Sequence, residues 1–462
     1  MMEETLQELT EDMRDELSEQ ARYLVHYIEN NDKDAFLDSF DELHTFDQAI
    51  FYVSLTTQLR RQIIDWLKPV ELADIFDEID PEDVDFNDLL SEMSPHYAAE
   101  MLAEMYTDNA VDLMSDLDTK QLAMYLSLMP KDSAEEIKRL LKYEDDTAGS
   151  LMSTEFIAIN QRLTISQAMV EVKKAAQEAE QINYIYILDD DGVLVGVISL
   201  KSLIVWPDAA MISEVMDTNL ITVGPADDQE EVAKIMADYN FVAIPVVVKE
   251  KMIGMITVDD IVDVIDEEAA EDYSRLAGVD VVNIEDNPIK SAVKRLPWLI
   301  GLIFLGMGTA SVIDGYNYLV AETSVLAVFI SLITGTAGNA GTQSLAVAVR
   351  RIALQEKQST LKSLLFEILI GALIGVLAGV TIFLVILVWK NNLLLGIAVG
   401  LAMGVAILVA NVAGAFIPLI MDKIGVDPAV ASGPFISTLS DLTSVVVYFN
   451  VAKIFIDHFM MH

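Results

Sequence analysis

The residue with the clearest chemical signature in this sequence is Asp441, which lies in an apolar run long enough to cross a bilayer. The run reads GPFISTLSDLTSVVVYFNVAKIF and places no Lys or Arg near the aspartate. A carboxylate at membrane depth is costly unless a polar or cationic group meets it, and such residues usually mark ion or proton paths. Ser437 lies four residues earlier, on the same side of a helix. We expect a passing cation to pair with Asp441; the alternative is a structural hydrogen bond to neighbouring hydroxyls.

A second polar stretch lies at membrane depth between Thr334 and Ser344, with the sequence TGTAGNAGTQS. Its glycines recur every third residue, which lets helix backbones approach closely and is typical of a packing seam. Its amide and hydroxyl groups also suit a pore wall that holds hydration water. We favour the pore wall because amide side chains concentrate there, and the two interpretations are compatible. The predicted pore-lining residues are Gly338, Asn339, Thr342 and Gln343.

The available ligands indicate the type of cation. The sequence has no cysteine and five histidines, so oxygen ligands favour a hard ion such as Mg²⁺ or Ca²⁺ over zinc or copper. Mg²⁺ gives up its water reluctantly and is usually held by one or two carboxylates through a retained water shell. A single Asp441 per subunit, doubled across a two-fold axis, fits this habit.

Five predicted membrane spans position these residues. Each is near or above the roughly 20 apolar residues that a bilayer demands. Lys and Arg precede the first span and fill the second loop, whereas the first outer loop has neither, so we expect a cytoplasmic N-terminus. An odd number of spans disfavours two inverted halves and favours a pore shared between subunits. The predicted cores are 297–316, 325–349, 364–389, 393–421 and 430–455.

Charge divides the chain where the membrane part begins. From Ser291 onward there are 8 acidic and 9 basic residues, out of 73 and 29 in the whole chain. A strongly acidic soluble part is therefore joined to a nearly neutral membrane part. The first residues, MMEETLQELT, contain no basic stretch followed by an apolar one. No signal peptide is expected, and the acidic part should stay in the cytoplasm.

The first part of the acidic region predicts stacked short helices. Apolar residues at helical spacing recur in units that begin 12 residues apart, at Phe86, Ala98, Ala110 and Leu122. Units this short cannot bury an apolar face alone, so we expect a superhelical array of helices.

From about Ser150 the pattern changes to strand, helix, strand, strand, helix, and it occurs twice. INYIYILDDDGVLVGVISLKSLIVW corresponds to FVAIPVVVKEKMIGMITVDDIVDVI, and the two copies resemble a tandem pair of CBS domains. In CBS domains that bind adenosine nucleotides, a Ser or Thr and an Asp three residues later hold the ribose. Thr257 and Asp260 match that pattern, whereas the first copy has Ser199 and Ser202. The resemblance implies either ATP binding or a ligand-free dimerisation module.

Taken in order, these parts resemble an MgtE-type magnesium channel over nearly all 462 residues. The most specific pieces are GNAGTQS and DPAVASGPFISTLSD, and Asp427 opens the second piece as a further candidate ligand. The resemblance implies Mg²⁺-selective uptake by a homodimer in the plasma membrane. It implies that Asp441 coordinates hydrated Mg²⁺ on the two-fold axis, and that the backbone oxygen of Ser437 lines the pore.

The fold class implied is a multidomain α plus α/β membrane protein. The expected domains are an acidic helical superhelix at 1–146, CBS domains at 147–209 and 210–275, a connecting plug helix at 276–296, and a pore domain of five helices at 297–462.

The same resemblance implies regulatory Mg²⁺ between the helical domain, the CBS pair and the connecting helix. Asn240 departs from the pattern, because the family often has an aspartate there. The matching carboxylates are Asp74 and Asp108, then Asp260 and Asp263, then Glu268, Glu271 and Asp272.

Electrostatics supports such a gate independently of the resemblance. Carboxylates gathered on facing surfaces repel one another, and divalent ions that bridge them stabilise a compact arrangement by mass action. If that arrangement holds the helix after Asp266 against the pore mouth, high internal Mg²⁺ closes the channel. The alternatives are a merely solvated acidic face, a cation antiporter that uses Asp441, and a membrane-anchored nucleotide sensor. The sequence has no P-loop, nucleophile elbow or zinc-binding helix motif, so we expect neither an enzyme nor a nucleic-acid partner.

Overall fold

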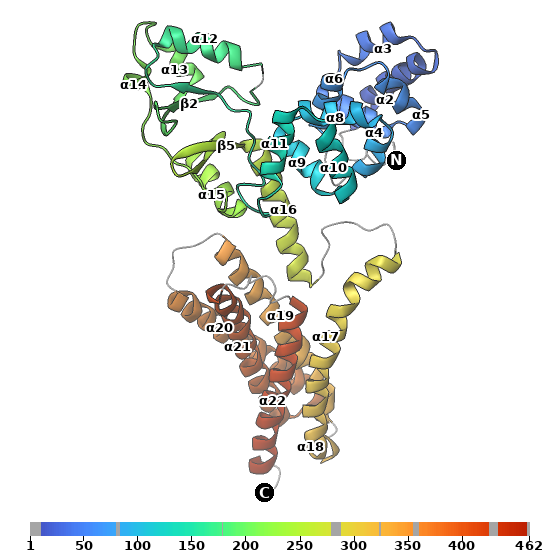
Figure 1. Ribbon diagram of the computed structural model, residues 1–462. Coiled ribbons are helices and arrows are strands. Elements are labelled where there is room, and N and C mark those ends of the chain that lie inside the picture. Colours follow the sequence, from blue (N-terminus) through green and yellow to red (C-terminus); the bar gives the residue numbers. More distant parts are fainter. Residues whose placement is uncertain are drawn as a thin grey trace. The chain divides into compact units, whose positions relative to one another are not determined.

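The computed structural model divides the chain into two compact units, Met1–Asp266 (unit 1) and Glu267–His462 (unit 2). Each unit has its own hydrophobic core. Figure 1 shows the helices and strands of both units. The structure describes residues 11–79, 84–177, 179–278, 288–322, 325–353, 360–424 and 433–459.

The first part of unit 1 is an array of short helices, as the 12-residue apolar repeat predicts. Leu90, Leu102 and Met114, at equivalent positions of three repeats, are buried in one core. Ser94 accepts a hydrogen bond from the Tyr97 amide (3.2 Å) and so fixes where one of these helices begins. The helices are α2 (Glu11–Glu29), α3 (Lys33–Phe40), α4 (Thr45–Ser54), α5 (Thr57–Ile64), α6 (Pro69–Phe76), α7 (Phe86–Ser91), α8 (Pro95–Glu104), α9 (Thr107–Ser115), α10 (Thr119–Leu128) and α11 (Lys131–Leu140).

The second part of unit 1 holds two strand-helix modules, which match the repeated pattern in the sequence. In the first, β1 (Ala158–Asn160) runs parallel to β2 (Tyr184–Leu188), and β2 pairs antiparallel with β3 (Leu194–Ser199). In the second, β4 (Ala243–Val248) pairs antiparallel with β5 (Lys251–Thr257). The helices of these modules are α12 (Ile165–Ala175), α13 (Leu200–Val205), α14 (Ile212–Val215) and α15 (Gln229–Tyr239).

Helix α16 (Val258–Ala277) follows β5, and the division between the two units falls within it. Ile261 is buried in the core of unit 1, and Leu276 packs in unit 2. The predicted connecting helix at 276–296 overlaps the end of α16, a segment outside the described residues, and the start of the next helix.

The described residues of unit 2 form five long helices. Four of them, α17, α20, α21 and α22, are long and apolar enough to cross a membrane. The remaining one, α19, has 29 residues and carries the polar stretch 334–344. The helices of this unit are α17 (Pro288–Gly315), the short α18 (Asn317–Glu322), α19 (Val325–Ala353), α20 (Thr360–Lys390), α21 (Leu393–Lys423) and α22 (Gly433–Phe459).

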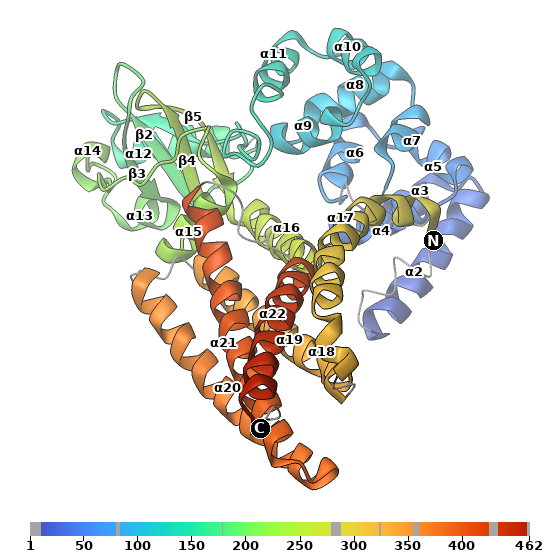
Figure 2. The same ribbon diagram turned by 90° about the horizontal axis from the view of Figure 1, so that it is seen from below.

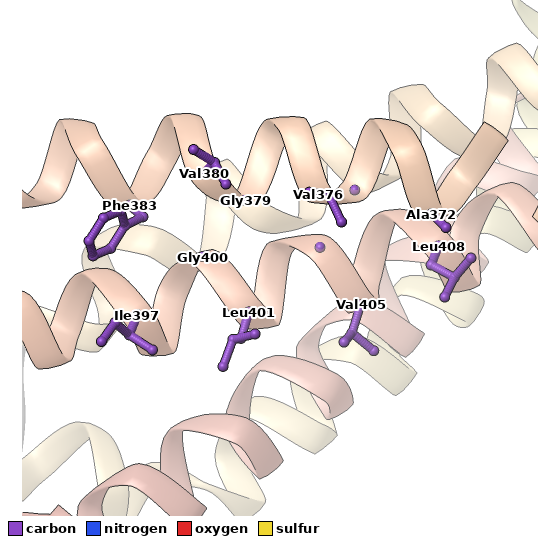
Figure 3. Close-up of a pocket in the computed structure, with 12 residues that line it drawn as sticks. Ala372, Val376, Gly379, Val380, Phe383, Ile397, Gly400, Leu401, Val405 and Leu408 are labelled. Atoms are coloured by element: carbon purple, nitrogen blue, oxygen red, sulfur yellow. The ribbon is translucent and has the colours of Figure 1, made fainter. Parts of the chain in front are cut away.

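Helices α20 and α21 lie side by side (Figures 1 and 2) because glycines remove the side chains between them. A Cβ added at Gly375 would lie 2.5 Å from the carbonyl oxygen of Gly404, and one at Gly379 would lie 2.6 Å from that of Gly400. A groove of about 450 Å³ runs along this pair (Figure 3). Glycine, alanine, valine, leucine, isoleucine and phenylalanine line the groove, and none of these side chains suits a cation.

Two candidate cation sites

The first candidate site begins at the N-terminus of α9. The cap residue Tyr106 makes no side-chain capping bond, and Asp77 instead accepts hydrogen bonds from the Tyr106 amide (3.2 Å) and the Asn109 side chain (3.1 Å). Asp108, the second residue of this helix, is buried. An acidic residue is favourable at this position because the helix dipole is positive there.

Two further carboxylates of unit 1 come from the strand-helix modules. Asp260 lies in the first turn of α16, where the Thr257 amide (3.2 Å) and hydroxyl (2.5 Å) donate to one of its oxygens. Glu180 lies in the segment between α12 and β2. One Glu180 oxygen is buried and has no hydrogen-bond partner among the described residues.

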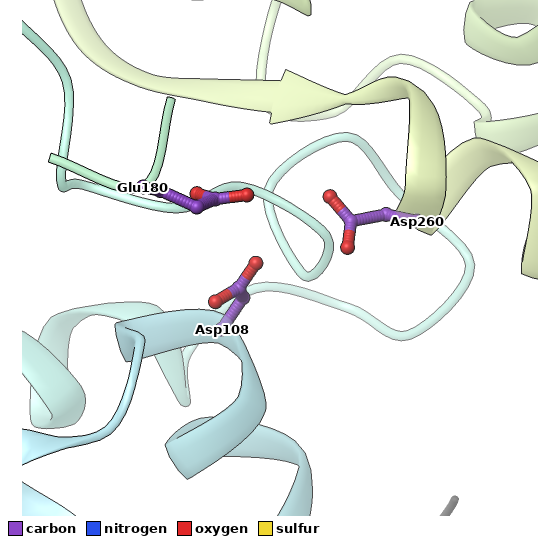
Figure 4. Close-up of side chains that lie close together, drawn as sticks. All are labelled: Asp108, Glu180 and Asp260. Carbon is purple, nitrogen blue, oxygen red and sulfur yellow. The ribbon is translucent and has the colours of Figure 1, made fainter. Parts of the chain in front are cut away.

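Asp108, Glu180 and Asp260 form the carboxylate cluster. One carboxylate oxygen of each lies within 4.8 Å of the others, and the three side chains point toward one another (Figure 4). Three segments far apart in the sequence therefore bring three acidic groups to one point.

The cluster is electrostatically costly. Burial raises the pKa of Glu180 to about 7, and the nearby charge of Asp260 adds to that rise. Burial raises the pKa of Asp260 to about 6. Burial, and then repulsion from Asp260, hold the pKa of Asp108 well above its usual range. Burial also raises the pKa of the neighbouring Asp77 to about 7.

The donor set fits a hard divalent cation. All three groups offer oxygen, which Mg²⁺ and Ca²⁺ prefer. The partnerless Glu180 oxygen supplies an unused ligand, and a bound cation would lower the cost of keeping the three carboxylates ionised. Asp108, Glu180 and Asp260 would hold such an ion, which would supply positive charge at their meeting point.

The structure brings together only part of the predicted regulatory set. Asp108 and Asp260 meet, and Glu180 joins them. Asp74 is exposed on α6 and Asp263 is exposed on α16, and neither belongs to the carboxylate cluster. Asn240 ends α15 in a left-handed conformation (φ 54°), which asparagine tolerates.

The other predicted regulatory residues lie on the part of α16 that belongs to unit 2. Glu271 pairs with Arg275 one turn later. Leu276, near the end of this helix, packs against Ile436 and other residues of unit 2. Its carbonyl oxygen would lie 3.3 Å from a Cβ added at Gly433, the first residue of α22. The end of α16 therefore touches the start of the helix that carries Asp441. The remaining members of this set are Glu268 and Asp272, which are half-buried.

The second candidate site is Asp441 on α22, where the polar stretch of α19 approaches. A Cβ added at Gly338 would lie 2.8 Å from the Ser437 hydroxyl oxygen and 3.5 Å from an Asp441 carboxylate oxygen. One at Gly341 would lie 2.8 Å from the Ser440 hydroxyl oxygen. The glycines thus form the packing seam and also bring the α19 backbone next to Asp441.

The other predicted pore-lining residues divide by exposure. Thr342 is half-buried and donates its hydroxyl to the Gly338 carbonyl (3.0 Å). Asn339 and Gln343 are exposed and four residues apart, so they occupy one face of α19. Asp427 lies outside the described residues.

Sequence analysis missed a buried carboxylate in unit 2, Glu367 on α20, which is 5% exposed. The Ser344 hydroxyl lies 3.0 Å from one Glu367 oxygen and 2.9 Å from the Asn411 carbonyl oxygen. Arg351 forms an ion pair with Glu367 at 3.6 Å. The signal was the same as for Asp441, an isolated acidic residue in an apolar run.

The predicted nucleotide-binding pair is closed in this structure. Thr257 is 2% exposed, and its hydroxyl donates to Asp260. A pocket of about 570 Å³ lies instead mainly along the first module, where Ser199 of the other copy of the motif is one of its lining residues. Its lining residues are Asn183, Tyr184, Ser199, Leu200, Lys201, Ile204, Val205 and Val242.

Three family models match the chain. A divalent cation transporter model matches residues 330–451, the MgtE intracellular N domain matches 43–146, and the CBS domain matches 148–207 and 212–267. The matched segments extend from within α19 to within α22, over α4 to α11 of the helical array, and over the two strand-helix modules, respectively.

Individual relatives agree with the family models. A magnesium transporter MgtE from Enterococcus faecalis is 53% identical over 448 residues, which cover 96% of this chain and 99% of that protein. The soluble part of a magnesium transporter, known from a crystal structure, is 46% identical and covers 55% of this chain and 99% of its own, with a TM-score of 0.54. The cytosolic domain of the Mg²⁺ channel MgtE in complex with ATP is 31% identical and covers 53% of this chain and 99% of its own, with a TM-score of 0.49.

Proposed function

Since the chain belongs to the MgtE family of magnesium transporters, we propose that it conducts Mg²⁺ into the cell and closes when internal Mg²⁺ is high. The observation that carries this proposal is the approach of the Gly338 backbone to Ser437 and Asp441. This contact brings backbone carbonyl groups, a serine hydroxyl and a carboxylate together within a multi-pass membrane unit.

The chemistry of this point suits a hydrated divalent cation. Glycine at position 338 lets the α19 backbone approach the carboxylate, and the Ser437 hydroxyl and nearby backbone carbonyls can accept hydrogen bonds from the water that a cation retains. Mg²⁺ is usually bound in this way, through one or two carboxylates and its own water shell. We propose Asp441 as the ion-binding residue and Ser437, Gly338 and Thr342 as pore lining.

A homodimer in the plasma membrane completes this pore. Asn339 and Gln343 are exposed on α19, which packs against α21 and α22, and an amide that faced lipid there would be unfavourable. A second copy that faces the same water-filled path would solvate these amides and add a second Asp441. The basic residues in the loops support a cytoplasmic position for the N-terminal unit.

The carboxylate cluster is the proposed sensor. Asp108, Glu180 and Asp260 repel one another until a cation pairs with them, so internal Mg²⁺ favours the arrangement in which they meet. Asp260 stands at the start of α16, and the end of that helix touches the start of α22. A change in the position of α16 can therefore reach the pore helix directly. Closure requires the cluster to bind more tightly in the closed state.

The test is the current through the full-length protein reconstituted in liposomes, with internal Mg²⁺ raised from micromolar to about ten millimolar. We expect the current to fall as internal Mg²⁺ rises, and to be lost in Asp441→Ala. Asp422→Ala, which removes an exposed carboxylate at the end of α21, is the matched control and should conduct normally. Slow flux that requires an opposing gradient would instead indicate an antiporter. Flux that survives Asp441→Ala would refute the assigned ion-binding residue and favour an anchored sensor.

A second candidate function is adenine nucleotide binding at the pocket of the first module. Ser199, which corresponds to Thr257 in the ribose-binding pattern, lines this pocket, and Lys201 offers a cation for phosphate. We propose this pocket rather than Thr257 and Asp260 for ATP, because Thr257 is buried. Titration with a fluorescent ATP analogue tests the assignment: Lys201→Ala should weaken binding, and Asp260→Asn should not.

A further inference from the structure

We infer that Glu155 is the positioning residue of the carboxylate cluster, because it ties together segments that carry the three ligands. The inference rests on the proposed function of the cluster as a Mg²⁺ sensor. Glu155 lies in the segment between α11 and β1, and it is not one of the three clustered carboxylates.

The backbone around Glu155 holds two of the three ligand segments. The Glu180 amide donates to the Glu155 carbonyl oxygen at 3.0 Å. Two residues earlier, Ser153 pairs with Met255 of β5 through two backbone hydrogen bonds, of 2.8 and 2.9 Å. Strand β5 ends three residues before Asp260. The segment 153–155 therefore holds β5, which leads to Asp260, and it also holds the backbone of Glu180.

The side chain of Glu155 holds the third ligand segment. Thr107, the first residue of α9, donates its amide (3.4 Å) and its hydroxyl to the Glu155 carboxylate. The Thr107 hydroxyl oxygen also lies 3.0 Å from that of Thr154. Because Tyr106 provides no side-chain cap, the carboxylate of another module caps this helix. Asp108 is the next residue along the chain.

Glu155 and Glu180 differ in what their oxygens do. The Glu155 carboxylate accepts from the Ser153 hydroxyl (3.0 Å), the Thr154 amide (3.0 Å) and Thr107. One Glu180 oxygen has no partner within the described part of the chain. The Glu155 carboxylate is thus occupied by hydrogen bonds and would affect cation binding through the residues that it holds. Glu180 instead has an oxygen available to bind the cation.

Partners that orient metal ligands typically change metal affinity by 10- to 100-fold when they are removed. Without the Glu155 side chain, the start of α9 loses its hydrogen bonds to the segment 153–155, so Asp108 must be brought into position when a cation binds. We therefore expect Glu155→Ala to raise the Mg²⁺ concentration at half-closure about tenfold. Current at micromolar internal Mg²⁺ should stay unchanged, because Glu155 is not part of the proposed pore.

The experiment measures a distance within unit 1 of the full-length protein as well as its current. The sequence has no cysteine, so Asp116→Cys on the α9 side and Ser213→Cys on the module side give two unique sites for spin labels. In Mg²⁺-free buffer, Glu155→Ala should broaden the distance distribution between the labels. Glu171→Ala, an exposed glutamate on α12, is the matched control and should leave the distribution unchanged.

Variants on the other side of the contact separate positioning from ligation. Thr107→Val should shift the Mg²⁺ midpoint in the same direction as Glu155→Ala, and the double variant should shift it no further than the larger single effect. Thr107→Ser and Glu155→Gln retain hydrogen-bonding groups and should shift it less than threefold, well below the change expected on losing an orienting partner.

Each result decides the inference. If Glu155→Ala leaves both the distribution and the midpoint unchanged, the inference is wrong. If Glu155→Gln is as defective as Glu155→Ala while the distribution stays narrow, Glu155 is a ligand and not a positioning residue. If the wild type shows no response to Mg²⁺ but Glu155→Ala broadens the distribution, the sensor function fails and the positioning role stands.

Discussion

The two candidate cation sites use carboxylates in opposite ways. In unit 1, one buried and two half-buried carboxylates from separate segments crowd one point, and burial raises the pKa of the two half-buried groups to about 6 and 7. In unit 2, a single aspartate stands beside glycine backbone and a serine hydroxyl. The first arrangement concentrates negative charge, and the second places one negative charge beside neutral polar groups.

This difference matches two different tasks. A sensor has to hold its ion long enough to bias a conformational equilibrium, which requires a differential affinity of several kcal/mol between states. A conducting site has to release each ion quickly, so its binding is favourable enough for entry and weak enough for exit. Crowded ligands suit the first task, and a lone carboxylate with retained water suits the second.

Neutralising the carboxylate cluster is expected to have the largest effect on this contrast. A triple variant should need at least about a hundredfold more Mg²⁺ for half-closure of the channel, because all three ligand charges are lost. It carries Asp108→Asn, Glu180→Gln and Asp260→Asn. Current at low internal Mg²⁺ should persist. The matched control is Glu171→Gln, Asp208→Asn, Glu214→Gln, which removes three exposed charges from unit 1. Closure at unchanged Mg²⁺ in the triple variant would contradict the sensor assignment.

The second prediction concerns pH. A bound cation requires ionised carboxylates, so the Mg²⁺ needed for closure should fall about tenfold between pH 6 and pH 8, across the raised pKa values of Asp260 and Glu180. In the absence of Mg²⁺, a rise in pH should instead be unfavourable, because it creates charges that no cation neutralises. The contribution of these carboxyl groups to the free energy of unfolding is present near pH 4 and is lost as pH rises through 6 to 7. Calorimetry of the Mg²⁺-free protein should show its unfolding temperature falling over this range. A flat profile would show that the cluster does not titrate as described.

A third prediction sharpens the contrast from the side of unit 2. Gly338→Ala places a methyl group 2.8 Å from the Ser437 hydroxyl oxygen, so α19 and α22 must separate or the serine must turn away. We expect a several-fold loss of single-channel conductance and an overpacking cost of about 1 kcal/mol or more. Gly335→Ala is the control, because nothing lies within 4 Å of its added Cβ. Equal conductance in the two variants would argue against a tight pore wall at Gly338.

The smallest expected effect is at Glu367. The Ser344 hydroxyl has one proton and two acceptors within reach, Glu367 and the Asn411 carbonyl. Glu367→Gln supplies an amide that can donate to Ser344, so we expect a current within about twofold of the wild type and no loss of thermal stability. Glu367→Ala removes the acceptor and the partner of Arg351, and should lower the unfolding temperature in detergent. A complete loss of current in Glu367→Gln would show that its charge acts in conduction.

Features set by local pattern were predictable from the sequence. The short helices follow from the 12-residue apolar repeat, the strand-helix modules from their duplicated pattern, and the long helices of unit 2 from apolar runs. Asp441 was found because a lone charge in such a run is costly. Glu367 obeyed the same rule, and attention to every acidic residue in the spans would have found it.

Features set by tertiary contact were not predictable in the same way. Glu180 lies in the segment QEAEQ, where nothing distinguishes it from the many exposed acidic residues of this chain. Its role arises only when α9 and α16 bury it beside Asp108 and Asp260. Asp77 and Glu155 are similar cases, because each caps a helix to which it is not adjacent in sequence. Local patterns carry no record of such long-range partners.

The glycine contacts between α20 and α21 have a mechanical consequence. At Gly375, Gly379, Gly400 and Gly404 the two backbones meet with no side chain between them, so neither helix can slide or roll without a carbonyl oxygen colliding with the other chain segment. Helices α20 and α21 should therefore move together as one rigid body. Any deformation that opens or shuts a passage through this unit must then fall on the contacts that this pair makes with the other helices, and not on the contact between α20 and α21.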